Sequence, residues 1–158
     1  MAKGTPSRTR ALLGVVAIAV VIAAQGCGGA GERSESLLAG TWDIDANKLV
    51  QAACGIPVGG VRTTLDVAIQ GDTVTALRED PTPAPPSAPY TGRIVPGGFT
   101  VSGQSAGTNA TASYVFTVTG IGSDGSKVTG VAEYAFQLNN PDGSNACSFK
   151  TTGVAIRR

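Results

Sequence analysis

Few side chains in this 158-residue chain could carry out chemistry, and they are mainly carboxylates and thiols. The chain has no histidine, which removes the commonest general base and the commonest metal ligand. Its three cysteines are Cys27, Cys54 and Cys147. Two carboxylates, Asp43 and Asp45, stand two residues apart and would share one face of a strand. Such a pair can do acid–base work, but we interpret it as two solvent-facing charges.

Sites for ions and cofactors are not indicated elsewhere in the sequence. Residues 139–143, NNPDG, approach a calcium-loop pattern but lack its alternating carboxylates and closing Glu, so we interpret them as a turn. The glycines fall in turns and tethers rather than in a phosphate-binding strand–helix motif. If Cys54 and Cys147 are bridged, no thiolate nucleophile remains there. We therefore expect neither catalysis nor a bound cofactor or metal.

The N-terminal segment has the pattern of a secretory signal. Lys3, Arg8 and Arg10 precede a stretch, residues 11–24, that is uncharged and almost wholly apolar. This stretch is shorter than the roughly 20 apolar residues of a transmembrane helix. The sequence therefore predicts export, with residues 1–26 as the signal peptide, and an uncleaved anchor is the alternative.

The end of this segment, Ala24-Gln25-Gly26-Cys27, resembles the lipobox of bacterial lipoproteins. The resemblance implies that Cys27 carries acyl chains such as palmitate, becomes the first residue of the mature protein, and holds it at the cell membrane or outer membrane. Ala24 and Gly26 fit the pattern, whereas Gln25 is uncommon in it. Ordinary cleavage nearby, without lipidation, is the alternative.

Lipidation would also account for the odd number of cysteines, because it leaves Cys54 and Cys147 as one pair in an oxidising compartment. Residues 27–36 would then be the lipidated cysteine and a small, polar tether, followed by one domain over residues 37–158. Loss of the three basic residues of the leader leaves nine Lys and Arg against eleven Asp and Glu. This charge of −2 predicts no nucleic-acid partner.

The body of the chain alternates apolar and polar residues with period two, as in antiparallel strands that bury one face. Turn signals separate the runs, and a short helix is expected after the first strand, within residues 45–55. These patterns predict an all-β fold, a meander barrel of about eight strands, with a β-sandwich as the alternative. We expect strands near residues 40–45, 61–70, 73–78, 90–95, 98–103, 111–119, 127–138 and 146–157.

Barrel closure would bring the second and third cysteines together. In a closed meander with an even number of strands, the last strand begins beside the end of the first, which places Cys54 and Cys147 at the same end. We therefore predict a disulfide between them. Residues 81–89 contain five prolines and predict a stiff, extended surface loop, although a docking ligand for a partner would have the same composition.

The start of the first strand, Gly40-Thr41-Trp42, resembles the Gly-x-Trp opening strand of lipocalin-like barrels. The resemblance implies that Trp42 closes the barrel floor against an arginine from a late strand, a role open to Arg157 or Arg158. A plain core position for Trp42 is the alternative.

Two non-enzymatic functions fit these patterns. The first, which we prefer, is an envelope-associated structural or interaction domain that engages an envelope protein or a glycan through loops such as residues 79–90. The second is a lipocalin-like carrier, because an eight-stranded barrel is just wide enough to be filled by side chains or to hold one small apolar ligand. The cavity of a carrier would be lined by Trp42, Leu65, Val67, Ile69, Phe99, Tyr114, Phe116, Tyr134 and Phe136.

Overall fold

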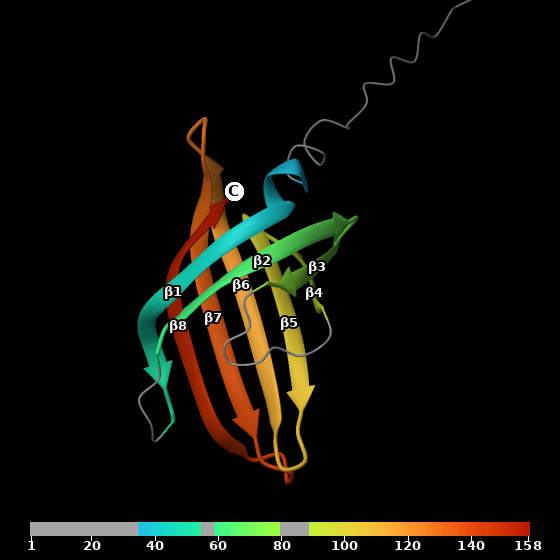
Figure 1. Ribbon diagram of the computed structural model, residues 1–158, viewed down its shortest axis with the longest axis vertical. Coiled ribbons are helices and arrows are strands. Elements are labelled where there is room, and N and C mark those ends of the chain that lie inside the picture. Colours follow the sequence, from blue (N-terminus) through green and yellow to red (C-terminus); the bar gives the residue numbers. More distant parts are fainter. Residues whose placement is uncertain (1–34, 55–58, 80–88) are drawn as a thin grey trace, which may run out of the picture.

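The computed structural model describes residues 35–54, 59–79 and 89–158. Eight antiparallel strands follow one another around a closed barrel, and the last pairs with the first (Figure 1). The predicted eight-stranded meander barrel is therefore confirmed, and the sandwich is not formed. The strands are β1 (Gly40–Ala52), β2 (Val61–Gln70), β3 (Thr73–Arg78), β4 (Tyr90–Val95), β5 (Gly98–Ala106), β6 (Thr111–Ser123), β7 (Val128–Asn139) and β8 (Asn145–Arg157).

Alternation of apolar and polar side chains decides which face of each strand lies inside. In β2, Thr63 and Leu65 are buried, while Arg62 and Asp66 on either side of them are exposed. The same alternation continues through β6 and β7, where successive odd or even positions pack into the interior. A shift of one residue in the pairing of two strands would move the buried side chains to the outer face. The burial pattern therefore fixes the register of the strands.

The prediction of a helix within residues 45–55 is wrong. β1 instead continues to Ala52, with shifts of register against β8 between Asp45 and Lys48 and between Leu49 and Gln51. Such bulges bend a strand around the barrel, and pairing with β8 outweighs the local helical signal. A helical turn over residues 35–38 precedes β1 and takes up the last two residues of the predicted tether.

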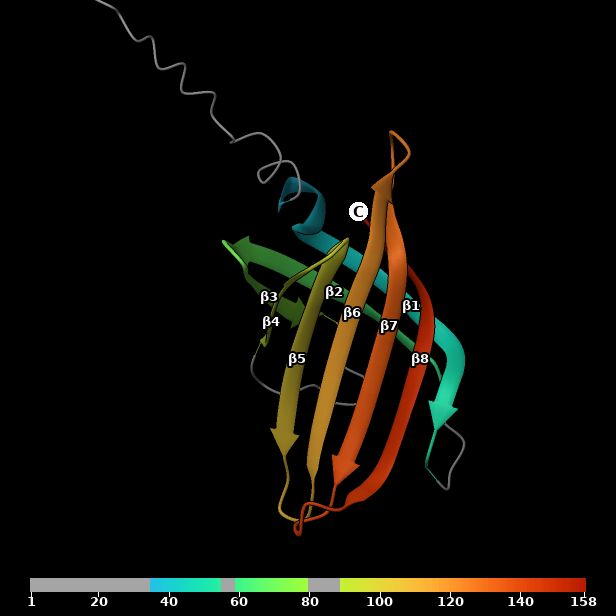
Figure 2. The same ribbon diagram turned by 180° about the vertical axis from the view of Figure 1, so that it is seen from behind.

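The two ends of the barrel are built differently. We call the end where β1 begins and β8 finishes the helix end, because the turn at residues 35–38 lies there (Figure 1). At the opposite end, which we call the disulfide end, Cys54 and Cys147 are bridged with their Cα atoms 4.5 Å apart, as predicted. Seen from behind, β5 to β8 form a long wall that extends past β3 and β4 toward this end (Figure 2).

The short strands leave part of that wall paired on one side only. β4 pairs with β5 over residues 98–102, whereas β6 pairs with β5 as far as Ala106. The part of β5 after residue 102, which we call its lower half, therefore has no partner in β4. The signal peptide, Cys27 and the tether before residue 35 lie outside the described residues, as does the proline-rich loop apart from Pro89.

Candidate functional site

The carboxylate pair singled out in the sequence lies on the outer wall of the barrel. An oxygen of Asp43 is 2.8 Å from the Arg158 guanidinium, and Asp45 is 2.9 Å from that of Arg62. The hydrogen bond from Arg158 is the main reason that the pKa of Asp43 lies below its usual value. Ion-paired carboxylates are poor general bases, so the interpretation as outward-facing charges is confirmed.

The sequence NNPDG forms a plain turn, as expected. Gly143 donates its backbone N–H to the Asn140 carbonyl, and Ser144 donates both its N–H and its hydroxyl to Asp142. These two bonds from Ser144 hold the pKa of Asp142 below its usual value. Among the described residues, no three Cys, Asp or Glu side chains gather where they could hold a metal ion.

The residues predicted to line a cavity all face the barrel interior, but they divide between its two ends. Seven of them are at most 5% exposed, while Ile69 and Phe136 are partly buried. The helix end is closed by Trp42, whose ring meets that of Phe99 edge-on at 5.8 Å. Its indole Nε1 donates to the carbonyl oxygen of Leu38 at 2.8 Å.

Arg157, and not Arg158, takes the position beside this tryptophan. It pairs with Trp42 across β1 and β8, and its guanidinium donates to the carbonyls of Ser36 and Ala39. Gly40 allows this approach, because its φ of 121° suits glycine alone and a Cβ there would lie 3.4 Å from Arg157 Cδ. Side chains and main chain therefore fill the helix end.

The half of the barrel toward the disulfide end contains a ladder of aromatic rings. The ring of Phe116 lies 5.5 Å from that of Tyr90 and 4.7 Å from that of Tyr134. Tyr134 continues to Phe149 at 5.8 Å, and Phe149 to Phe136 at 5.1 Å. The inner rings are buried, whereas those of Phe136 and Phe149 are partly exposed. Planar apolar surface is therefore accessible only at the outer part of the ladder.

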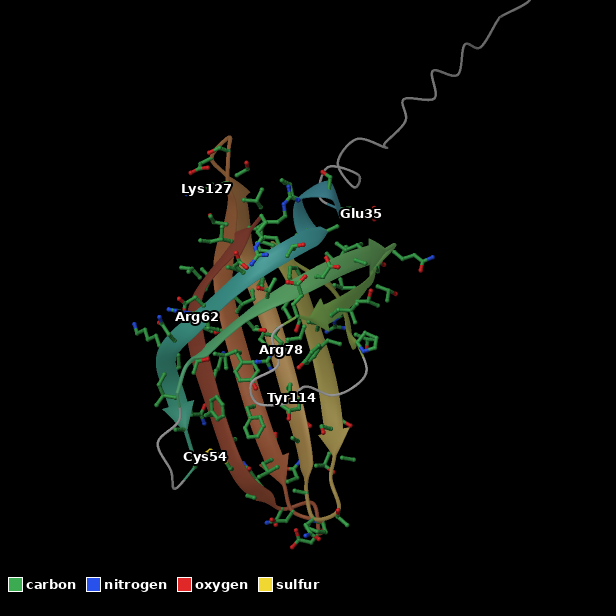
Figure 3. The ribbon with its side chains drawn as sticks, in the orientation of Figure 1. Glu35, Cys54, Arg62, Arg78, Tyr114 and Lys127 are labelled. Carbon is green, nitrogen blue, oxygen red and sulfur yellow. A yellow bond between two sulfur atoms is a disulfide. The ribbon has the colours of Figure 1, made fainter. Side chains whose placement is uncertain are left out.

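Arg78, the last residue of β3, places a positive charge among these rings. Its Nε donates to the Thr63 hydroxyl at 2.9 Å, and its Cζ lies 6.0 Å from the centroid of Phe116. Figure 3 shows Arg78 and Tyr114 within the outline of the barrel and Arg62 at its margin. A guanidinium inside an apolar barrel is costly to desolvate, so its placement there calls for interactions that favour the charge.

Two phenols accompany this guanidinium in addition to Thr63. Burial is the main cause that raises the pKa of Tyr90 and of Tyr134, and the charge of Arg78 opposes this rise in both. Both phenols therefore stay protonated at neutral pH and can donate hydrogen bonds. Thr151, opposite Tyr134 in the β7–β8 register, is fully buried, and its hydroxyl oxygen has no hydrogen-bond partner.

Sequence reasoning missed four members of this cluster: Arg78, Tyr90, Phe149 and Thr151. Arg78 follows Val74 and Ala76 at the spacing that turns a side chain inward, and Phe149 and Thr151 share the alternation of β8. The period of two was therefore the available signal for these three, whereas Tyr90 is the first residue of β4. From sequence alone, a charged residue at such a position is interpreted as the end of the strand. Only the closure of the barrel shows that its side chain faces inward.

Several hollows lie at the surface of the described chain, including one of about 230 Å³ beside Phe136 and Phe149. One of about 410 Å³ lies at the lower half of β5, between Pro89, Gly103 and Tyr114. Another of about 550 Å³ crosses the outer wall over β1, between the Asp43–Arg158 and Asp45–Arg62 ion pairs. Val154 and Ile156 in that second hollow are 54% and 40% exposed.

No family model, curated protein or solved structure matches this chain. Within the described part of the chain, no helix is both long and apolar enough to span a bilayer.

Proposed function

We propose that this protein is an exported, lipid-anchored binding domain that holds a small ligand in the half of the barrel toward the disulfide end and catalyses no reaction. The observation that carries the proposal is Arg78, a guanidinium set among buried hydroxyls and aromatic rings. Apolar walls with a few convergent polar groups are the usual composition of small-molecule sites.

The groups of this site are suited to holding a ligand. Arg78 is a permanent cation, and Tyr90 and Tyr134 are phenols whose pKa is raised by burial. A guanidinium and protonated hydroxyls donate hydrogen bonds to an acceptor, and none of them accepts a proton near neutral pH. The chemistry of the cluster therefore supports binding rather than proton transfer.

The position of the tether supports an orientation for the domain. Residue 35 lies at the helix end, so a lipid on Cys27 would hold that end nearest the membrane (Figure 1). Eight polar and small residues of this kind span roughly 15 Å on average. The disulfide end would then face away from the membrane, where a ligand in the surrounding compartment can reach it.

The anchoring part of the proposal is tested by the mass of the mature protein. The wild-type protein extracted from membranes should carry acyl chains on Cys27, and Cys27→Ser should lack them and leave the membrane fraction. A wild-type mass without lipid would end the anchoring proposal and leave the binding proposal to be judged separately.

The binding part is tested with a neutral aromatic probe, 2-naphthamide, by equilibrium dialysis against the detergent-solubilised protein. We expect saturable binding that weakens at least roughly tenfold in Phe149→Ala, because the ring lost there carries much of the apolar contact. Val154→Ala, on the outer wall of the same strand, is the matched control and should bind as the wild type does. Non-saturable uptake, identical in all three proteins, would contradict the proposal.

A second candidate function is an envelope interaction domain, with a protein or glycan bound on the outer wall. It is favoured by Val131 and Val154, which are paired across β7 and β8 and are both more than half exposed, and by Ile156 beside them. Val154→Asp should then abolish recovery of the partner from solubilised membranes. Recovery that is unchanged in Val154→Asp would reject this surface.

A further inference from the structure

We infer that the outer wall of β7, β8, β1 and β2 binds a second copy of this chain and forms a two-fold symmetric dimer. The surface is the one that supports the second candidate function, so the inference rests on that function and adds the identity of the partner. It is independent of ligand binding inside the barrel. Three observations carry it: an exposed apolar patch, a hollow beside the patch, and charges that are balanced in pairs.

The apolar patch lies where β7 and β8 pair. Val131 is the partner of Val154 in the register of these strands, and Ile156 is the partner of Thr129. Val131 and Val154 are 51% and 54% exposed, and Ile156 is 40% exposed. Exposed apolar side chains that cluster within a polar rim are typical of a protein–protein contact.

The hollow of about 550 Å³ over β1 adjoins this patch. Val154 and Ile156 form its apolar side, and two ion pairs of the outer wall border it. Val131 is not one of its lining residues and lies next to it on β7. An exposed apolar side chain and a hollow with an apolar side therefore lie next to each other on one face.

The relative positions of Val131 and the hollow favour a second copy as the occupant. In a two-fold symmetric contact, each feature of one copy must meet its complement on the other. A two-fold axis along β8, between the copies, reverses the order of the strands and lays β7 of each copy over β1 of the other. Val131 and Asp45 are at the same level of the barrel, because both are partners of Val154. Val131 of each copy therefore enters the hollow of the other.

The charges around the patch favour a like partner over a strongly charged one. Six of them are balanced in ion pairs with N–O distances of 2.8 or 2.9 Å: Asp43–Arg158, Asp45–Arg62 and Glu133–Lys150. Lys48 on β1 adds one positive charge. Because the face is close to neutral, two copies that approach each other are not strongly repelled. A nucleic acid or an anionic bilayer gains little attraction from such a face.

The size of the face predicts a weak dimer. Four strands at the usual spacing are roughly 20 Å wide, and the outward residues of β7 between positions 129 and 137 extend over roughly 25 Å. Each copy would cover roughly 500 Å², less than the roughly 800 Å² per partner of a stable complex. We therefore expect a reversible dimer with a dissociation constant of micromolar order. The same axis keeps both helix ends on one side, so copies anchored to one membrane can pair.

The inference is tested by sedimentation equilibrium of the detergent-solubilised full-length protein, with the solvent matched to the density of the detergent. We expect the wild type to pass from monomer to dimer as its concentration rises through the micromolar range. Val131→Asp and Val154→Lys should each weaken dimerisation at least roughly tenfold, because each places a charge in an apolar contact. Leu77→Asp, a similarly exposed residue on the outer wall of β3, is the matched control and should dimerise as the wild type does.

An equimolar mixture of Val131→Asp and Val154→Lys tests the two-fold arrangement. In the mixed dimer the two introduced charges have opposite signs and meet at one contact, while the symmetry-related contact stays native. The mixture should therefore regain dimerisation to within roughly threefold of the wild type. A mixture that associates no better than either variant alone would overturn the inference.

A wild type that remains monomeric at all concentrations would also overturn the dimer. That result would leave the second candidate function to its own test, the recovery of a different partner by Val154→Asp. Dimerisation that neither single substitution weakens would place the contact elsewhere and would likewise contradict the inference.

Discussion

Two arginines face the interior of the same barrel, and they differ in what surrounds them. Arg157 donates to main-chain carbonyls of the helical turn and lies beside Trp42, so its role is to fasten that turn to the barrel. Arg78 faces side-chain hydroxyls and the ring of Phe116. The described partners of Arg157 are therefore main-chain groups, whereas those of Arg78 are side chains.

The ends also differ in how completely they are packed. At the helix end, Trp42 and Phe99 have no exposed surface and are in edge-on contact. At the disulfide end, Phe136 and Phe149 keep partial exposure, and the covalent bridge fixes the chain. One end of the barrel is therefore stabilised by packing, whereas the other retains accessible surface and is stabilised by a cross-link.

The largest loss of stability is expected from Trp42→Ala at the helix end. Removing a fully buried indole and its hydrogen bond to Leu38 should lower the free energy of unfolding by about 3–5 kcal/mol in a denaturant titration. Ile156→Ala, on the outer wall, is the control and should change stability by less than about 0.5 kcal/mol. Similar losses in the two variants would remove the distinction between a packed helix end and the rest of the barrel.

Removal of the disulfide is expected to cause the second-largest loss of stability. The bridge joins residues 93 apart in the sequence, and the double variant Cys54→Ala/Cys147→Ala should lose about 2–5 kcal/mol of unfolding free energy. Reduction of the wild type should give a loss of the same size. A melting temperature that neither reduction nor the double substitution alters would show that packing alone holds the disulfide end.

Substitution of the two arginines should separate stability from binding. Arg157→Gln should cost roughly 1–3 kcal/mol of stability, because carbonyls of Ser36 and Ala39 lose a charged donor. Arg78→Met should stay within about 1 kcal/mol of the wild type, since an apolar side chain of similar volume replaces a charge in an apolar interior. A larger loss in Arg78→Met than in Arg157→Gln would assign Arg78 a structural role.

The smallest effect on stability is expected from the titration of the Asp43–Arg158 ion pair on the outer wall. The bond to Arg158 lowers the pKa of Asp43 in the folded protein, so the pair stabilises the fold above the ordinary Asp pKa of about 4. This contribution should disappear as the pH falls through the lowered folded pKa. The stability difference between the wild type and Arg158→Gln should therefore be small at pH 7 and absent at about pH 2. A difference that grows on acidification would contradict this ion pair.

The period of two in the sequence was sufficient to predict the strands, the barrel and the disulfide, because burial on one face and closure of an even meander follow from it. The extension of β1 through Lys48 and Leu49 was missed, since pairing with β8 is a long-range effect that overrides local helical preference. The role of Arg78 could not be predicted either. The period of two turns Arg78 inward, but its aromatic and hydroxyl neighbours come from other strands that only the closed barrel brings together.

The central claim, that the two inward arginines have different roles, is tested most directly by resolving their Nε–H signals in a two-dimensional nitrogen–proton spectrum. Single substitutions assign the signals of Arg78 and Arg157 in the detergent-solubilised protein. Addition of 2-naphthamide should shift the Arg78 signal in a saturable way and leave the Arg157 signal in place. A naphthamide-dependent shift of Arg157 alone, or of neither arginine, would contradict the account.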